Sequence, residues 1–293
     1  MAAGIVPTLA ELVALREAAR ARSPARRGRF GASGQAQSPL RGRGMEYAES
    51  REYARGDDAR HIDWRVTART GRAHTKLYQA ERERLTLLVA DTAPALYFGT
   101  RVRFKSVQAA RAGALAAWSA IGDGDRVAAL RGSMREPPVA PAAGTRGVLR
   151  VLDALVRWYT TPPAEDAGLE VALEHARRLL KPGSRLYVLA DPASVVAVPA
   201  HRWAALAMHS EVRVRLLSDP LEREPPAALL PFAAAPAAGA AAAGDAHRIE
   251  LDLAAPAVRQ RWKAAFDGPL QSALAQLSAR GIRADVLSSG DAP

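Results

Sequence analysis

The strongest constraint on the fold is a rhythm that runs from residue 85 to the end of the chain. Short, nearly continuous apolar runs alternate with longer segments whose apolar residues recur every three or four positions. Such runs are typical of strands buried on both faces of a parallel sheet, and the periodic segments are typical of covering helices. We therefore expect an α/β fold with a mostly parallel central sheet and helices on both faces. The expected strands are residues 85–90, 126–130, 185–190, 212–217, 249–253 and 282–287.

Each expected helix shows one apolar face, which is the pattern of side chains that point into a core. The helices cover residues 104–118, 148–159, 169–180 and 262–277. Pro269 is expected to kink or split the last of them, because its ring removes a backbone donor and clashes with the preceding turn.

Three regions are expected along the chain. Residues 1–30 form an N-terminal helix and a basic arm, and residues 31–84 form a charged segment that packs on the main domain. Residues 85–293 form that main domain. Within it, residues 225–246 are rich in Pro and Ala and are interpreted as a loop insert.

The chain contains no cysteine, which excludes disulfides, thiolate zinc sites, iron–sulfur clusters and cysteine nucleophiles. It also lacks the Gly-x-Ser-x-Gly elbow, the His-Glu-x-x-His pair and the P-loop. His61 and Asp63 are spaced so that the acid could orient the imidazole as a general base, but we interpret His61 as part of a hydrogen-bond network. We expect a protein without enzymatic activity and without a cofactor.

Charge and hydropathy indicate where the protein resides and what it binds. No run of about 20 strongly apolar residues occurs, and the N-terminus is polar where a signal peptide would be apolar. A cytoplasmic protein without a membrane span is expected. The net charge is +11, and most of the excess lies in the first third of the chain. Binding of nucleic acid by this basic arm is kept only as a further alternative, because no recognition motif accompanies the charge.

The most informative segment is residues 41–83, which mixes Arg, carboxylates and aromatic residues too densely for a plain core or a plain surface. Arg and carboxylate side chains in such density predict bidentate ion pairs that are obligatory for stability, since unpaired charges resist burial. Substitution of Asp58 or Arg60 by Ala is therefore expected to destabilise the fold. The candidate interaction residues are Arg41, Gly42, Gly44, Glu46, Arg51, Tyr53, Gly56, Asp57, Asp58, Arg60, Ile62, Asp63, Trp64 and Arg69.

This segment resembles the signature of the bacterial domain-of-unknown-function fifty-eight family. The matching pieces are RGRG followed by Glu46, REYARGDDARHIDW at 51–64, TARTGR at 67–72 and QAERE at 79–83, with SDPLERE at 218–224 and RGI at 280–282 further on. The resemblance implies a fold similar to the von Willebrand factor type A domain. It also implies a partner, because members of the family are commonly encoded beside ATPases of the MoxR class of the AAA+ superfamily.

Type A domains typically hold Mg²⁺ through an Asp-x-Ser-x-Ser turn after the first strand, a later Thr and a later Asp. The resemblance places Asp91 and Asp191 at the two Asp positions, and Asp166 or Ala167 at the Thr position. The two Ser positions hold Ala93 and Ala95, whose methyl groups cannot coordinate a cation. We expect a degenerate site near Asp91 and Asp191, with both carboxylates accepting hydrogen bonds from backbone amides or Arg. The alternative is that Asp91, Asp191 and Asp166 hold Mg²⁺ loosely through water.

The leading hypothesis is a non-enzymatic protein-interaction or assembly module that acts with a MoxR-class AAA+ ATPase on a client protein, which the sequence does not identify. The first alternative is an adhesion-type module that binds its ligand through Mg²⁺.

Overall fold

A six-stranded, mostly parallel sheet forms the centre of the protein, as predicted. The structure is a computed structural model that describes residues 4–22, 41–79, 84–233 and 248–291. The strand order is β10-β7-β6-β3-β4-β5, and all neighbours are parallel except β5, which runs antiparallel to β4. The strands are β3 (Leu85–Ala90), β4 (Arg126–Arg131), β5 (Val139–Ala142), β6 (Arg185–Ala190), β7 (Glu211–Ser218) and β10 (Arg283–Ser288).

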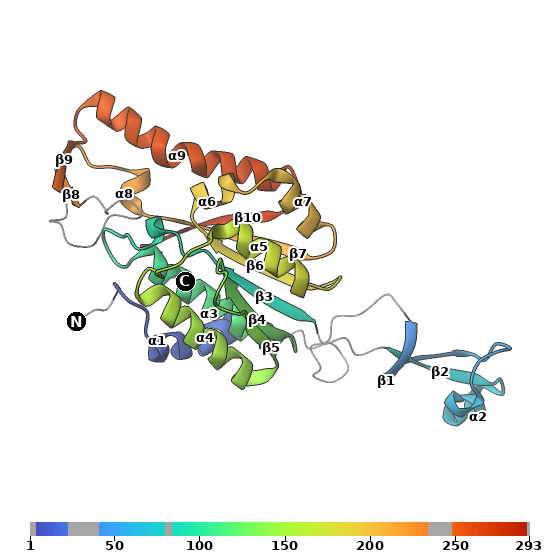
Figure 1. Ribbon diagram of the computed structural model, residues 1–293. Helices are drawn as coiled ribbons and strands as arrows, with labels where there is room; N and C mark the ends of the chain where they lie inside the picture. The colour runs from blue at the N-terminus through green and yellow to red at the C-terminus, as the bar shows by residue number, and fades with distance from the viewer. Residues whose placement is uncertain (1–3, 23–40, 80–83, 234–247, 292–293) are drawn as a thin grey trace.

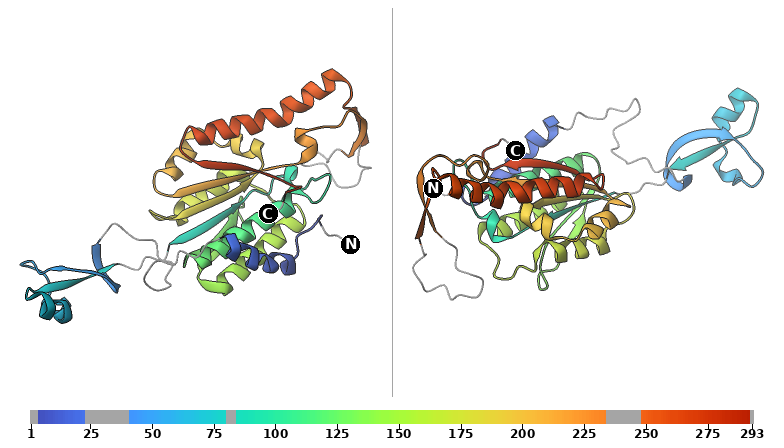
Figure 2. Two further views of the ribbon diagram at one scale, coloured as in Figure 1. Left: turned by 180° about the vertical axis from the view of Figure 1, so that it is seen from behind. Right: turned by 90° about the horizontal axis from the view of Figure 1, so that it is seen from above.

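Helices cover both faces of this sheet (Figures 1 and 2). Alternate residues of a strand point to opposite faces, so β3 sends Leu88 and Ala90 into one core and Leu87 and Val89 into the other. The first core is closed by α1 (Leu9–Arg22), α3 (Lys105–Gly122) and α4 (Gly144–Thr160). The second is closed by α5 (Gly168–Leu179), α6 (Pro192–Ala197), α7 (Ala200–Ala207) and α9 (Pro256–Ser278). Among the helices of the described ranges, none combines the length and the apolar character that crossing a bilayer needs.

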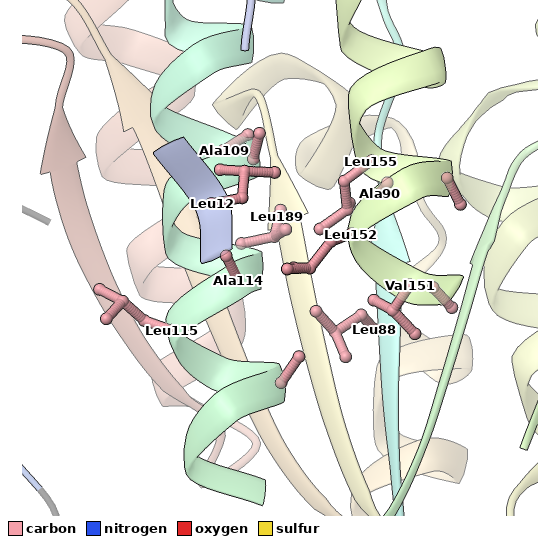
Figure 3. Close-up of a cluster of buried hydrophobic side chains, with 14 of the residues drawn as sticks. Leu12, Leu88, Ala90, Ala109, Ala114, Leu115, Val151, Leu152, Leu155 and Leu189 are labelled. Carbon is pink, nitrogen blue, oxygen red and sulfur yellow. The ribbon is translucent and has the colours of Figure 1, made fainter. Parts of the chain in front are cut away.

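The N-terminal helix belongs to the sheet domain rather than to a separate region. Leu12 on α1 is fully buried and shares a cluster with Ala109 of α3 and Leu152 of α4 (Figure 3). The indole Nε1 of Trp118 donates to the carbonyl of Leu12 at 3.0 Å, and Arg111 pairs with Glu11. The expected boundary at residue 30 is therefore wrong for the helix. Residues 23–30 lie outside the described part of the chain.

Two expectations for the C-terminal half are corrected. The helix α9 runs unsplit through Pro269, because Leu270, Ala273 and Leu277 fix its second half against the sheet. The apolar run at 249–253 is not a strand of the central sheet. It corresponds to β9 (Arg248–Asp252), which pairs with β8 (Leu229–Ala233) in a separate hairpin that follows α8 (Pro220–Arg223).

The β8–β9 hairpin also corrects the expected loop insert at 225–246, because β8 lies inside it. Residues 234–246 of that insert lie outside the described residues. Phe232 of β8 contacts Trp262 of α9 with ring centroids 5.3 Å apart, so an aromatic contact holds the hairpin on the helix.

The charged segment forms its own lobe. In it β1 (Arg41–Glu52) pairs antiparallel with β2 (His74–Gln79), and the connection holds a single 3-10 turn (Ala59–His61) and α2 (Trp64–Thr70). Figures 1 and 2 show this hairpin lobe standing apart from the sheet domain. The sheet domain also contains a short 3-10 turn at Pro94–Leu96. The segment was expected to pack on the main domain; among the described residues its elements make their extensive contacts with one another.

Candidate functional site

The turn of the hairpin lobe is fixed by Asp57. Its carboxylate accepts from Arg51 Nη2 at 2.6 Å and from the backbone N–H of Ala54 at 2.9 Å, and Tyr53 Oη donates to its carbonyl at 3.0 Å. The Ala54 amide first and Arg51 second lower the pKa of the Asp57 carboxyl. Gly56 beside it has φ +107°, a conformation that L side chains rarely adopt. The sequence therefore places Asp57 and Gly56 where the turn requires them.

The other two candidate aspartates are helix caps. Asp58 Oδ1 accepts from the backbone N–H of Arg60 at 3.0 Å at the start of the 3-10 turn. Asp63 Oδ1 accepts from the N–H groups of the first two residues after Trp64 at 3.2 Å each, and its Oδ2 accepts from Ser50 Oγ at 2.9 Å. These bonds, led by a backbone amide, outweigh burial and lower the pKa of Asp63. Asp58 thus positions the backbone of the 3-10 turn, and Asp63 positions the start of α2 and joins it to β1.

Among the described residues of the lobe, ion pairs are fewer than the predicted interlocked network requires. Ion pairs of the lobe join Arg51 to Asp57 and, on the exposed surface, Arg72 to Glu52 at 2.9 Å. Arg55, Arg60, Arg65 and Arg69 are exposed, and no ion pair or side-chain hydrogen bond joins them to the part of the chain that the structure describes. Arg60, expected to be structural, has its side chain in solvent. Backbone amides bind the carboxylates of Asp57, Asp58 and Asp63, which the charge pattern assigned to pairs with arginine.

The lobe exposes its largest apolar side chain. Trp64 begins α2 and is 71% exposed, and Tyr53 is 37% exposed, whereas Ile62 is half-buried and bridges to Thr75 of β2. Arg60 lies in the 3-10 turn just before Trp64, and Arg65 and Arg69 follow Trp64 on α2. We call Arg60, Trp64, Arg65 and Arg69 the Trp64 region.

Four candidate residues cannot be placed by their side chains. They belong to strand β1, and their side chains are outside the described part of the chain; the four are Arg41, Gly42, Gly44 and Glu46.

A second candidate site lies at the carboxyl ends of the central strands. The chain proceeds from β3 outward to β4 and β5 on one side, and from β6 outward to β7 and β10 on the other. Strand order therefore reverses between β3 and β6, the position at which open α/β sheets bind ligands. Asp91 directly follows β3 and Asp191 directly follows β6, as the sequence predicted.

Asp91 is buried and held by backbone amides. Its Oδ1 accepts from the N–H of Ala93 and its Oδ2 from the N–H of Asp191, both at 3.0 Å. Burial raises the pKa of Asp91 to about 6, although hydrogen bonds from Ser194 and the two amides oppose the rise. This confirms the expectation that the Asp91 carboxylate serves as a hydrogen-bond acceptor at the end of the sheet.

Asp191 binds a buried lysine. Its Oδ1 caps α6 through the N–H of Ala193, and its Oδ2 accepts from Lys105 Nζ at 2.9 Å. The same Nζ donates to Glu222 Oε1 at 2.6 Å, and Lys105 is only 1% exposed. Burial lowers the pKa of Lys105, but the charges of Asp191 and Glu222 outweigh it and the net shift is upward. Lys105 is therefore an ammonium ion.

The buried polar chain continues to the end of β10. Glu222 Oε2 accepts from the N–H of Asp219 at 2.8 Å in the capping box of α8. Asp219 in turn accepts from Ser289 Oγ at 2.6 Å and from the Thr100 hydroxyl. These residues connect β3, β6, β7 and β10 with the first turn of α3. We call Asp91, Lys105, Asp191, Asp219 and Glu222 the switch-edge cluster.

The donor set of the switch-edge cluster does not fit Mg²⁺. Ala93 and Ala95 provide no oxygen, and the ammonium of Lys105 already contacts Asp191. Asp166 is exposed and accepts from the N–H of Gly168. Within the described ranges no group of three metal-binding side chains comes together. A hard cation that needs about six oxygen ligands thus lacks them here.

Sequence reasoning missed Lys105 and Glu222. One signal was present: only four of the 41 basic residues are lysines, and Lys105 begins a helix that is mostly buried. A compact ammonium suits a site between two carboxylates better than the planar fork of Arg.

Comparisons with known proteins agree with the resemblance in the sequence. The family model described as "Protein of unknown function DUF58" matches residues 49–266. Uncharacterized proteins of Mycobacterium bovis and of two strains of Mycobacterium tuberculosis are 32% identical over 189 residues, which is 63% of this chain and 58% of theirs. The chain therefore spans less than two thirds of the length of these relatives. No solved structure matches.

Proposed function

Since the chain belongs to the DUF58 family, we propose that it is a non-enzymatic protein-interaction module whose hairpin lobe docks on a partner protein. The sheet domain carries the lobe and is, in this proposal, a type A-like scaffold. Its strand order and the two aspartates at the switch point support that assignment.

The observation that carries the proposal is the exposure of Trp64. A tryptophan ring offers a large apolar area, and such rings with neighbouring arginines are enriched at the energetic centres of protein interfaces. Trp64 is 71% exposed, on a helix whose start is fixed by Asp63. The lobe therefore presents a preorganised anchor that its own fold does not use.

The charges around Trp64 favour an acidic partner surface. Arg60, Arg65 and Arg69 are exposed and unpaired among the described residues, so they keep their full hydrogen-bonding capacity for carboxylates. We propose that the partner is a MoxR-class AAA+ ATPase, as the family resemblance implies, and that the pair assembles or remodels a client protein.

Affinity capture tests the proposal. The tagged chain is incubated with native lysate with and without ATP, and captured proteins are identified by mass spectrometry. We expect a nucleotide-sensitive AAA+ ATPase that is retained by the native chain and lost with Trp64→Ala and with Arg65→Glu/Arg69→Glu.

Met208→Ala is the matched control, because Met208 is 73% exposed but lies on the sheet domain. It should capture the ATPase normally. Capture of the ATPase by the Trp64→Ala variant at the native level, or absence of any AAA+ ATPase from the native sample, would contradict the proposal.

A further inference from the structure

We propose that the ammonium group of Lys105 occupies the cation position at the switch point of the sheet, so that this edge is held together by an internal cation in place of a metal ion. The inference concerns the switch-edge cluster and does not depend on the function proposed for the lobe.

Two carboxylate oxygens converge on a single buried nitrogen. Lys105 Nζ lies 2.9 Å from Asp191 Oδ2 and 2.6 Å from Glu222 Oε1. Within the described part of the chain no other donor reaches these two oxygens, because backbone amides bind the second oxygen of each carboxylate. These two oxygens therefore form a cation-binding pair, and the ammonium of Lys105 fills it.

The position of Lys105 in its helix shows that the carboxylates determine it. Lys105 is the first residue of α3, and the positive end of a helix dipole disfavours a cation there. Complete burial disfavours it further. Only the two carboxylates offset both effects, so the placement is explained by the site and not by the helix.

The cation position lies where a ligand of the sheet would bind. Asp191 follows β6 at the reversal of strand order, and Asp91 follows the adjacent β3. Through Glu222 and Asp219 the same ammonium connects this point to the end of β10. A divalent cation bound here could exchange with solvent, whereas a tethered ammonium cannot leave. The arrangement makes the edge independent of metal concentration.

Removal of the ammonium tests the inference. Thermal unfolding of the full chain and of Lys105→Ala is measured without divalent cations and in a titration with Mn²⁺ and Mg²⁺. The midpoint of the native chain should not move with either ion. The midpoint of Lys105→Ala should be lower, and Mn²⁺ or Mg²⁺ should raise it in a saturable manner, because the ammonium no longer occupies the site and the two freed carboxylate oxygens accept a cation that keeps water as its other ligands.

Two controls keep the test decisive. Lys105→Ala/Asp191→Asn lacks one of the two freed carboxylates and should lose the response to the ion. If Lys105→Ala does not fold alone, recovery of its native circular dichroism is measured on refolding with millimolar Mn²⁺ and with K⁺. A rise in the midpoint of the native chain with Mg²⁺ would overturn the inference. So would a Lys105→Ala variant that gains nothing from any divalent ion, in the midpoint or in refolding.

Discussion

Replacement of Lys105 by Met should destabilise the sheet domain by about 3–5 kcal/mol, because it leaves two carboxylates buried without their cation. The distances from Nζ are 2.9 Å to Asp191 and 2.6 Å to Glu222. With an effective dielectric constant of about 20, Coulomb's law gives roughly 6 kcal/mol of attraction for each contact. Desolvation of the three buried charges offsets most of this in the native protein. The Lys105→Met variant loses this attraction, whereas the free-energy cost of burying the carboxylates of Asp191 and Glu222 remains.

The assay is urea unfolding followed by far-ultraviolet circular dichroism, analysed as a double-mutant cycle with Glu222→Gln. The double variant should lose less than the sum of the single losses, by about 1–3 kcal/mol, because the two residues interact directly. Arg20→Met is the control, since Arg20 pairs with Glu17 on the surface with 61% and 78% of the two side chains exposed. It should change stability by less than about 1 kcal/mol. Additive losses, or a Lys105→Met loss no larger than the control, would refute the reasoning.

Three further predictions concern other parts of the molecule. Because the pKa of Asp91 is raised from 3.8 to about 6, the folded state holds more protons between these values, so Asp91 lowers stability by about 2 kcal/mol as pH rises from about 4 to 6. Urea titrations from pH 4 to 7 should show this fall in the native chain relative to Asp91→Asn, and parallel curves would argue against it. Leu12→Ala should reduce the free energy of unfolding by about 2–5 kcal/mol, whereas Leu9→Ala, 42% exposed on the same helix, should change it little. Asp63→Ala should speed amide hydrogen exchange within Trp64–Thr70 while exchange in β3 and β6 stays unchanged, and protection lost throughout the sheet would count against an independent lobe.

The central sheet could be predicted because its strands are buried on both faces and therefore read as apolar runs. An apolar run does not indicate which other strand it pairs with. For this reason β9 was assigned to the central sheet although it pairs with β8. The antiparallel edge strand β5 was missed because it is short and contains Pro141, which only an edge tolerates. The helix α1 was expected, but its apolar residues do not say which surface they cover.

The residues of the candidate sites were likewise predictable only in part. Asp91 and Asp191 could be found because both directly follow apolar runs. Lys105 could not be joined to them, because it lies 86 residues from Asp191 and 117 residues from Glu222 in the chain. In the lobe, charge counts favoured pairs between side chains. The carboxylates of Asp57, Asp58 and Asp63 instead bind nearby backbone amides, since an Asp within two or three residues of an amide needs little chain ordering to reach it.

Site-specific crosslinking tests the central claim, that the lobe is the docking element, most directly. A photoreactive phenylalanine analogue is placed at position 64 of the full chain, and at position 208 as the control, and both proteins are irradiated in native lysate with and without ATP. We predict a nucleotide-dependent adduct with an AAA+ ATPase from position 64 and none from position 208. An adduct with that ATPase from position 208 alone would contradict the account.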